Sequence, residues 1–298
     1  MKGVFNMKYT LENKNVQIVA STFGGELNSL SSKKDNLEFL WNGDEAHWKY
    51  HSPILFPIIG KVKNGRYIAE NKEYELPQHG LARTKEFKMI EKDENYVVFE
   101  LLWSEETLKV YPYKFSLKLS YELLENGVKV GYSVKNLDNK DIYFSIGGHP
   151  AFMCPLFENE SFEDYYFELN KKENAKIMIL DSNTGYFSRT ESEFLKDENI
   201  INLNLDLFKN DAIVFKNLKS NIITLKSNKN DRELSMDFTG FPYLAIWTKP
   251  TGAPFVCLEP WYGHADFDDF KGDITEKAAI EKLSIGSEFT ASYNLYIK

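Results

Sequence analysis

The sequence has two cysteines in 298 residues, Cys154 and Cys257, and no closely spaced cysteine pair. Disulfide frameworks and zinc knuckles need more cysteines at shorter spacing, so we expect two free thiols. No apolar run approaches the ~20 residues that a membrane-spanning helix needs. The opening segment MKGVFNMKYTLENKN lacks the apolar core of a signal peptide. These absences predict a cytoplasmic protein that does not cross a membrane.

Basic residues are in the minority, with 36 Lys and Arg against 44 Asp and Glu, a net charge of −8. Non-specific binding to nucleic acid or to anionic lipid relies on basic surface. We therefore expect no nucleic-acid partner and no membrane partner.

Several cofactor and nucleophile motifs are also missing, namely GxGxxG, Walker A and GxSxG. Their absence argues against the common dinucleotide, nucleotide and serine-hydrolase functions. His47 and His51 have the spacing of a zinc-protease motif, but Trp48 stands where that motif has its glutamate. Pro53 follows closely and the segment has no helical periodicity, so we expect no metal site and no cofactor there.

Large side chains are abundant: 43% of residues are hydrophobic and 15% are aromatic, which predicts a sizeable buried core. Residues 114–124 alternate between apolar and polar, as do residues 128–136. Between them lies Asn126-Gly127, which is typical of a β-hairpin turn. Further strands are predicted at 16–20, 96–103, 141–146, 165–169, 222–226, 233–238, 243–248, 255–260 and 288–297.

Helical segments are few. Residues 189–197 are a candidate helix, 205–209 a short helical turn, and the residues between Pro53 and Pro57 a loop. No linker, repeat or shift in composition divides the chain. We therefore predict a single all-β domain over residues 1–298, a large antiparallel β-sandwich or barrel-like fold.

Two of the five histidines are candidate functional residues. His149 lies in SIGGHPAF at the end of a predicted strand, where Gly147 and Gly148 allow close approach of other groups. It can serve as an acid or base, or simply end the strand. His79 lies in LPQHGLAR with Arg83 four residues on, which suits sugar or anion recognition, or an ordinary surface loop. His47, His51 and His264 have weaker context, and we expect His264 to be exposed.

Two carboxylates complete the candidates. Strand parity places Phe255, Cys257 and Glu259 on one face of an apolar strand. Burial would raise the pKa of Glu259 and make it a useful general base, although a structural ion pair is the alternative. Asp211 opens the apolar run in KNDAIVFKN and could accept hydrogen bonds from hydroxyl groups, or be a plain turn residue.

Five segments together resemble the aldose 1-epimerase (galactose mutarotase) family, and they occur in the order found in that family. The segments are FPIIGKVKNGRY at 56–67, LPQHGLAR at 76–83, GGHPAF at 147–152, NDAIVFKN at 210–217 and APFVCLEPWYG at 253–263. GGHPAF and LEPWYG are most similar to a bacterial branch of mutarotase-like proteins. The resemblance implies a galactose mutarotase-like supersandwich with an open sugar-binding cleft.

The resemblance also implies a cofactor-independent reaction on a hexose. His149 would protonate the ring oxygen while Glu259 removes the proton of the C1 hydroxyl. His79 would hydrogen-bond the sugar, and Asp211 would bind it. The family usually has Arg where Lys61 aligns, which raises the possibility of a different sugar or weaker activity.

Other functions and site residues stay open. A hexose-6-phosphate 1-epimerase would need basic groups for the phosphate, and Lys61, Arg66 and Arg83 could supply them. A carbohydrate-binding or sensing protein on the same scaffold is the non-enzymatic alternative, although it would not need an acid–base pair. Trp48, Trp247 and Trp261 could stack on a sugar ring or belong to the core. Monomer and homodimer are equally consistent with the sequence.

Overall fold

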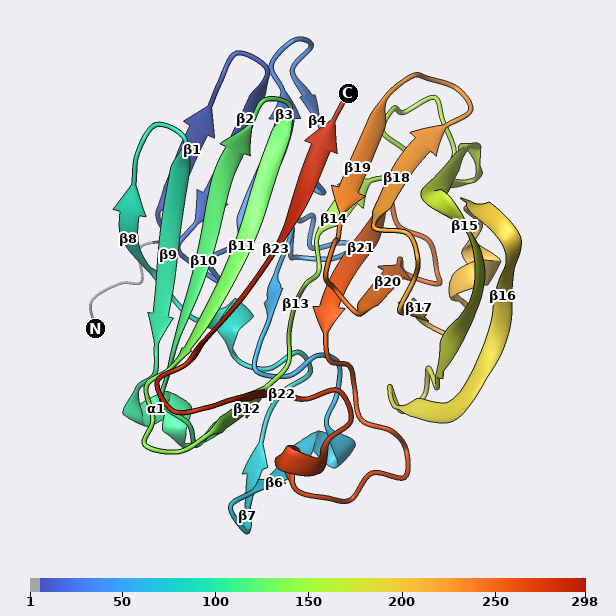
Figure 1. Cartoon of the computed structure of the whole chain (residues 1–298). Helices are drawn as coiled ribbons and strands as arrows, with labels where there is room; N and C mark the ends of the chain where they lie inside the picture. Colours follow the sequence, from blue (N-terminus) through green and yellow to red (C-terminus); the bar gives the residue numbers. More distant parts are fainter. Residues whose placement is uncertain (1–5) are drawn as a thin grey trace.

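The computed structural model describes residues 6–298, and antiparallel strands dominate it (Figure 1). In this range the α-helix α1 (Glu105–Leu108) is accompanied by short 3₁₀ turns. None of the helices described is long and apolar enough to cross a membrane. The prediction of an all-β antiparallel sandwich is confirmed.

Most strands belong to one large sheet, in which every pairing is antiparallel. Its order is β5 (Ile54–Leu55), β13 (Ile146–Gly148), β21 (Phe255–Tyr262), β20 (Tyr243–Trp247), β17 (Ile213–Lys216), β15 (Tyr165–Leu180), β18 (Ile222–Ser227), β19 (Glu233–Asp237), β23 (Glu288–Ile297), β11 (Gly127–Asn136), β10 (Phe115–Leu124), β9 (Tyr96–Leu102) and β8 (Lys88–Lys92). β14 (Ala151–Met153) also pairs with β21, and β16 (Phe187–Asn202) pairs with β15.

Three smaller sheets complete the fold. Their strands are β1 (Lys8–Glu12), β2 (Val16–Ser21), β3 (Leu27–Ser32) and β4 (Leu37–Glu38) in one sheet, β12 (Ile142–Phe144) with β22 (Glu281–Leu283), and β6 (Arg66–Ala69) with β7 (Lys72–Glu75). The β1–β4 sheet lies behind β9–β11 in Figure 1. Rings of Tyr9 and Phe99 meet across this interface at 5.7 Å, and the Tyr121 hydroxyl donates to the Gly25 carbonyl.

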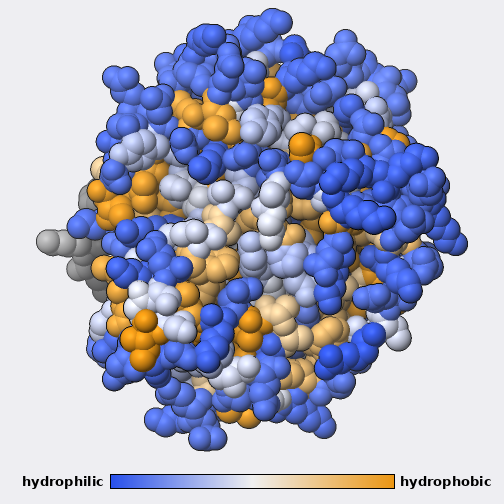
Figure 2. Space-filling view, in the orientation of Figure 1, coloured by the Kyte–Doolittle hydropathy of each residue, from blue (hydrophilic) through white to orange (hydrophobic). Residues whose placement is uncertain are grey.

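The core forms because alternate residues of facing strands point into the same space. Val97, Phe99, Leu117 and Leu119 are at most 1% exposed and belong to the same cluster as Ile18 of the smaller sheet. Exposed large hydrophobic residues are scattered, and Figure 2 shows a face covered mostly by hydrophilic residues.

The 114–136 hairpin is confirmed, but its turn is one residue earlier than predicted. Leu124 pairs with Gly127, so Glu125 and Asn126 form the two-residue turn. Gly127 serves a different purpose, since a Cβ there would lie 1.9 Å from the Leu295 carbonyl oxygen of β23. The glycine allows close approach of a neighbouring strand rather than a positive φ.

Three predictions of secondary structure are corrected. Residues 189–197 form part of strand β16, because pairing along β15 outweighs local helix propensity. Residues 54–55, expected to be loop, form β5 and pair with β13. The predicted strand 141–146 divides at Ser145 into β12 and β13, which lie in different sheets. The helical turn at 205–209 is confirmed as a 3₁₀ turn, Leu205–Phe208.

Two side-chain predictions are also decided. His264 is 2% exposed, not exposed as expected, because the rings of Phe187, Tyr243 and Phe267 surround it. The two cysteines are free thiols, as predicted, and both are buried.

Candidate active site

All six predicted site residues line one cleft of about 370 Å³. They come from segments spread over two thirds of the chain and are Lys61, His79, Arg83, His149, Asp211 and Glu259. Trp48, Trp247 and Trp261 line the same cleft. The structure therefore brings the candidates together, while their roles stay predictions.

Glu259 reaches the cleft from strand β21. The predicted parity is confirmed, since Phe255 and Cys257 pack in one cluster while Val256 and Leu258 pack in another. The Glu259 side chain is almost fully buried, at 1% exposure. Burial raises the pKa of this carboxyl well above its ordinary value, and the nearby Asp211 raises it further.

His149 lies in the short connection between β13 and β14, and its backbone N–H donates to the Pro53 carbonyl at 3.1 Å. The two preceding glycines are required by close packing. A Cβ on Gly147 would lie 2.6 Å from Trp261, and one on Gly148 would lie 2.7 Å from the Tyr132 hydroxyl. Close packing against Trp261 of β21 and Tyr132 of β11 thus fixes the segment that precedes His149.

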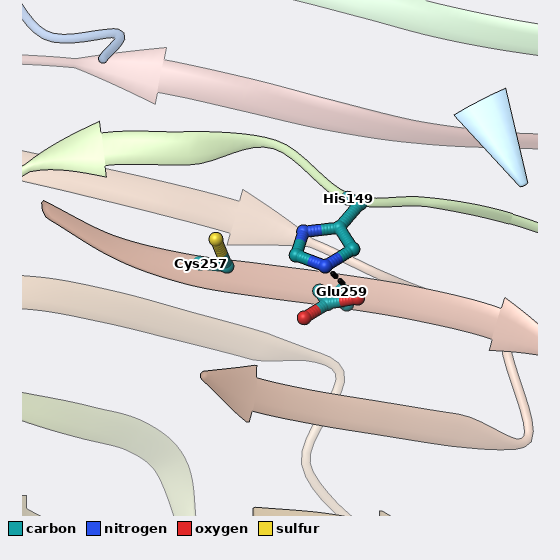
Figure 3. Close-up of side chains that lie close together, drawn as sticks. All are labelled: His149, Cys257 and Glu259. Atoms are coloured by element: carbon teal, nitrogen blue, oxygen red, sulfur yellow. Dashed lines mark ion pairs between the residues drawn. The ribbon is translucent and has the colours of Figure 1, made fainter. Parts of the chain in front are cut away.

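Nε2 of His149 lies 3.3 Å from Oε2 of Glu259 (Figure 3). Burial lowers the pKa of His149 to about 3, and the Arg83 charge acts in the same direction. Both shifts disfavour the charged forms, so burial works against an ion pair at this contact. Oε2 of Glu259 and Nδ1 of His149 have no hydrogen-bond partner in residues 6–298. The pair thus lies in a site of low polarity.

His79 is held in a left-handed conformation, with φ at 66°. Its Nδ1 accepts a hydrogen bond from the Gly60 N–H at 3.1 Å. Burial lowers its pKa well below the ordinary value, and His149 contributes. A neutral imidazole that accepts at Nδ1 carries its proton at Nε2. His79 is therefore a donor at Nε2, where the side-chain amide of Gln78 lies 3.3 Å away in the lining of the cleft.

The two cleft cations make no ion pair with any described carboxylate. Arg83 lies over the Tyr50 ring at 4.8 Å and donates to the Gln78 carbonyl at 2.8 Å. Lys61 donates from Nζ to the Thr184 carbonyl at 3.2 Å. Both keep further donors available, because each ends in several N–H groups.

Asp211 precedes β17 with a φ of 82°. Its Oδ1 accepts from the Ala212 N–H at 2.8 Å. Burial raises its pKa, although that hydrogen bond and Lys61 oppose the shift. A side-chain hydrogen bond from Trp247 also favours the charged carboxylate, which lines the cleft where a hydroxyl group could meet it.

Sequence reasoning missed one wall of the cleft and misplaced one cation. Leu180, Ser182, Gly185 and Phe187 line the cleft from the tip of the long β15–β16 hairpin, at the right of Figure 1. No local pattern indicated this wall, because part of β16 was predicted as helix. Arg66 does not line the cleft, since its guanidinium pairs with the carboxylates of β7.

The donor atoms of His149, Cys257 and Glu259 lie within 4.8 Å of one another. However, one ring nitrogen faces Glu259 and the other lies on the side of Cys257 (Figure 3). A single nitrogen of His149 nevertheless lies within 4.8 Å of both other donor atoms, so the expectation of no metal site stays a prediction. His51 instead lies beside Glu26, with Nδ1 at 3.6 Å from Oε2.

The model of the family described as aldose 1-epimerase matches residues 7–277. The chain belongs to the aldose 1-epimerase family. It is 34% identical to the plasmid-encoded protein LacX of Lactococcus lactis subsp. lactis, over 98% of this chain and 99% of that protein. The resemblance inferred from the five segments is thereby confirmed.

Two solved structures of similar proteins have the same fold. One is a galactose mutarotase related enzyme from Lactobacillus acidophilus, 34% identical, with a TM-score of 0.94 over 98% of this chain and 97% of that one. The other is a galactose mutarotase-like protein from Lactobacillus casei, 31% identical, with a TM-score of 0.92 over 98% and 100%. The supersandwich predicted from the sequence is the fold observed.

Proposed function

We propose that this family member is an isomerase that interconverts the α and β anomers of a free hexose. The observation that carries the proposal is the contact between His149 and Glu259 on a sugar-sized cleft. Anomer exchange needs one group that donates a proton and one that accepts a proton, held side by side. It involves no net oxidation, so no cofactor is required.

The reaction moves two protons and one C–O bond. One group of the pair takes the proton of the C1 hydroxyl while the other donates to the ring oxygen. The C1–O5 bond breaks, C1=O forms, and rotation about C1–C2 presents the other carbonyl face. Closure reverses the transfers and returns the pair to its first state.

The family roles make His149 the acid and Glu259 the base, whereas burial disfavours the charged form of each group in the unliganded site. The charged pair and the neutral pair differ by one proton transfer across the 3.3 Å contact. The hydroxyls of a bound sugar replace part of the missing solvation, which favours the charged form. Each group then contributes on the order of 10²–10⁴-fold to the rate.

The remaining candidate residues bind the sugar. His79 donates from Nε2, Asp211 accepts from a hydroxyl, and Lys61 and Arg83 donate from the lining of the cleft. We propose that the protein acts in the cytoplasm, as a monomer or homodimer forming one domain over residues 1–298, without nucleic-acid or membrane partners.

Polarimetry tests the proposal. Freshly dissolved α-D-glucose and α-D-galactose would mutarotate faster with the wild type, and His149→Ala and Glu259→Gln would abolish the acceleration while keeping sugar affinity. Glu281→Gln is the matched control, because this carboxyl is half-buried with a raised pKa but does not line the cleft. If the substitutions change sugar affinity but neither the wild type nor any variant shows turnover, the protein is instead a carbohydrate-binding protein.

A hexose-6-phosphate is the second candidate substrate. The observation that favours it is that Lys61 and Arg83 form no ion pair with a carboxylate of residues 6–298. Glucose 6-phosphate belongs in the same polarimetric series, and a higher kcat/KM than for glucose would select the phosphorylated substrate.

A further inference from the structure

We propose that Trp48 and Tyr50 are positioning residues, through which one loop orients both His149 and Arg83 for the reaction. The loop is residues 39–53, between β4 and β5, and is called here the aromatic loop. This inference rests on the proposed function only for its kinetic readouts. It assigns to these two aromatic residues a task other than direct stacking on the sugar.

Trp48 packs against the ring of His149. The two ring centroids are 4.8 Å apart, with 33° between the planes. Trp48 also stacks on Phe255 at 5.6 Å and 29°, which fixes the indole in turn. Much of the indole surface is thus committed to protein side chains rather than open to a sugar.

The packing matters because His149 lacks the usual constraint on a catalytic imidazole. Such a ring is normally oriented by a hydrogen bond at its second nitrogen. Here Nδ1 of His149 is buried without a hydrogen-bond partner in residues 6–298. Trp247 and His79 touch the ring edge-on, at 5.5 Å each. The tilted Trp48 contact, the shortest of the three at 4.8 Å, is therefore the one that sets the ring plane.

Tyr50 does the same for Arg83. The guanidinium lies 4.8 Å from the centre of the Tyr50 ring and makes one hydrogen bond, to the Gln78 carbonyl. A cation over an aromatic face is held by electrostatic attraction while its N–H edge stays free. Tyr50 thus holds the Arg83 guanidinium at the cleft and leaves its N–H groups free to donate hydrogen bonds.

Hydrogen bonds hold the aromatic loop in place close to Trp48 and Tyr50. The indole N–H of Trp41 donates to the Trp48 carbonyl at 2.8 Å. A single oxygen of Glu26 accepts from the N–H groups of His51 and Ser52, at 2.7 and 2.9 Å. The same loop therefore has a fixed path just before and just after the two aromatic residues.

The loop is also tied to the backbone of His149. The Pro53 carbonyl accepts from the His149 N–H at 3.1 Å, and the His51 carbonyl accepts from the Ala151 N–H at 2.9 Å. The main chain and the ring of His149 are thus both held by the aromatic loop. Truncating Trp48 would free the ring while leaving the main-chain contacts in place.

The decisive experiment compares Trp48→Leu, Trp48→Phe and Tyr50→Leu with the control Trp103→Leu. Trp103 is a partly buried tryptophan that lies under Lys114 and does not line the cleft. Trp48→Leu should lower kcat about tenfold or more with KM nearly unchanged, because misorientation of a reacting group slows the chemical step. Trp48→Phe keeps a stacking ring and should recover most of kcat. Tyr50→Leu should mainly raise KM.

The second readout is the protonation of the His149 imidazole. The titratable groups facing His149 are Glu259, His79, Arg83 and Cys257. Removing the indole admits water to His149, so its NMR titration and the acid limb of the pH–rate profile should move to higher pH in Trp48→Leu. Trp48→Phe and the Trp103 control should leave both in place. His149→Ala assigns the resonance.

Some results would overturn the inference. A raised KM with unchanged kcat in Trp48→Leu would show that Trp48 instead stacks on the sugar. An unmoved His149 titration in a folded Trp48→Leu protein would refute positioning without reference to turnover. Trp48→Met replaces the leucine variant if circular dichroism shows that the latter does not fold. If the His149 titration moves in Trp48→Leu but the wild type turns over no sugar, only the proposed function is refuted.

Discussion

Gly60 and His79 hold each other through two hydrogen bonds, one in each direction. The His79 N–H donates to the Gly60 carbonyl at 2.8 Å, and the Gly60 N–H donates to Nδ1 of His79 at 3.1 Å. The first bond shapes the turn, and the second decides which ring nitrogen carries the proton. A local backbone contact thereby determines that His79 offers a donor to the cleft.

That contact predicts an ordering of two amide substitutions at position 79. In His79→Gln the side-chain amide can reach the place of Nε2 and still donate, whereas in His79→Asn it reaches only the place of Nδ1. Loss of a hydrogen bond to the sugar costs about 1 kcal/mol or more, so KM should rise about tenfold in His79→Asn and less in His79→Gln. Steady-state kinetics checks the order, and equal KM values would contradict it.

Stability at acid pH should depend on His149. Its pKa is about 3 in the folded protein, against an ordinary value near 6.5. Between these values the unfolded chain binds the extra proton, so the free energy of unfolding falls as pH falls through this window. Urea unfolding at pH 4 and pH 7 should show a smaller loss for His149→Asn than for the wild type. His264, whose pKa burial lowers to about 4, contributes equally to both proteins.

Glu259 should have the opposite effect at pH values above its ordinary pKa of 4.5. Burial raises its pKa, so the folded protein binds the extra proton and unfolding becomes easier as pH rises towards the raised value. Glu259→Gln removes this ionisation and should raise the unfolding temperature at pH 8.5, with little change at pH 4.5. An equal shift at both pH values in calorimetry would show that ionisation is not the cause.

Lys61 should contribute to sugar binding in two ways, through its charged donor group and through its hydrogen bond to one wall of the cleft. Its Nζ donates to the Thr184 carbonyl in the hairpin tip, which forms one wall of the cleft. Lys61→Met removes both the tether and the donor, and should raise KM for the sugar severalfold. Lys61→Arg supplies the residue usual in the family and should keep KM within about threefold of the wild type. An Arg variant as impaired as the Met variant would contradict this assignment.

The buried pair Asp266–Lys277 should be the most sensitive ionic contact. The two side chains are each 2% exposed and lie 2.5 Å apart, and the Asp266 N–H also donates to the Lys61 carbonyl. Lys277→Met leaves a buried carboxylate unpaired and should cost about 3–5 kcal/mol in urea unfolding. Arg66→Ala, which breaks the exposed pairs to Glu73 and Glu75, should cost at most about 1 kcal/mol.

The fold class was predictable because alternation along a strand is a local property of the sequence. Residues 115–124 and 127–136 show which side chains face the core without knowledge of the partner strands. The same parity placed Glu259 on the face of Cys257. The order of the family segments was enough to name the six candidate residues that the cleft brings together.

Other features required the tertiary structure, because they depend on segments distant in sequence. Residues 189–197 become a strand through pairing with β15, and the turn beyond that pairing supplies a cleft wall. His264 looks polar in sequence but is enclosed by three rings from other elements. The tautomer of His79 and the stacking of Trp48 on His149 follow from contacts made across the fold. The sequence determined which side chains are available, and long-range packing decided their burial, their protonation and their neighbours.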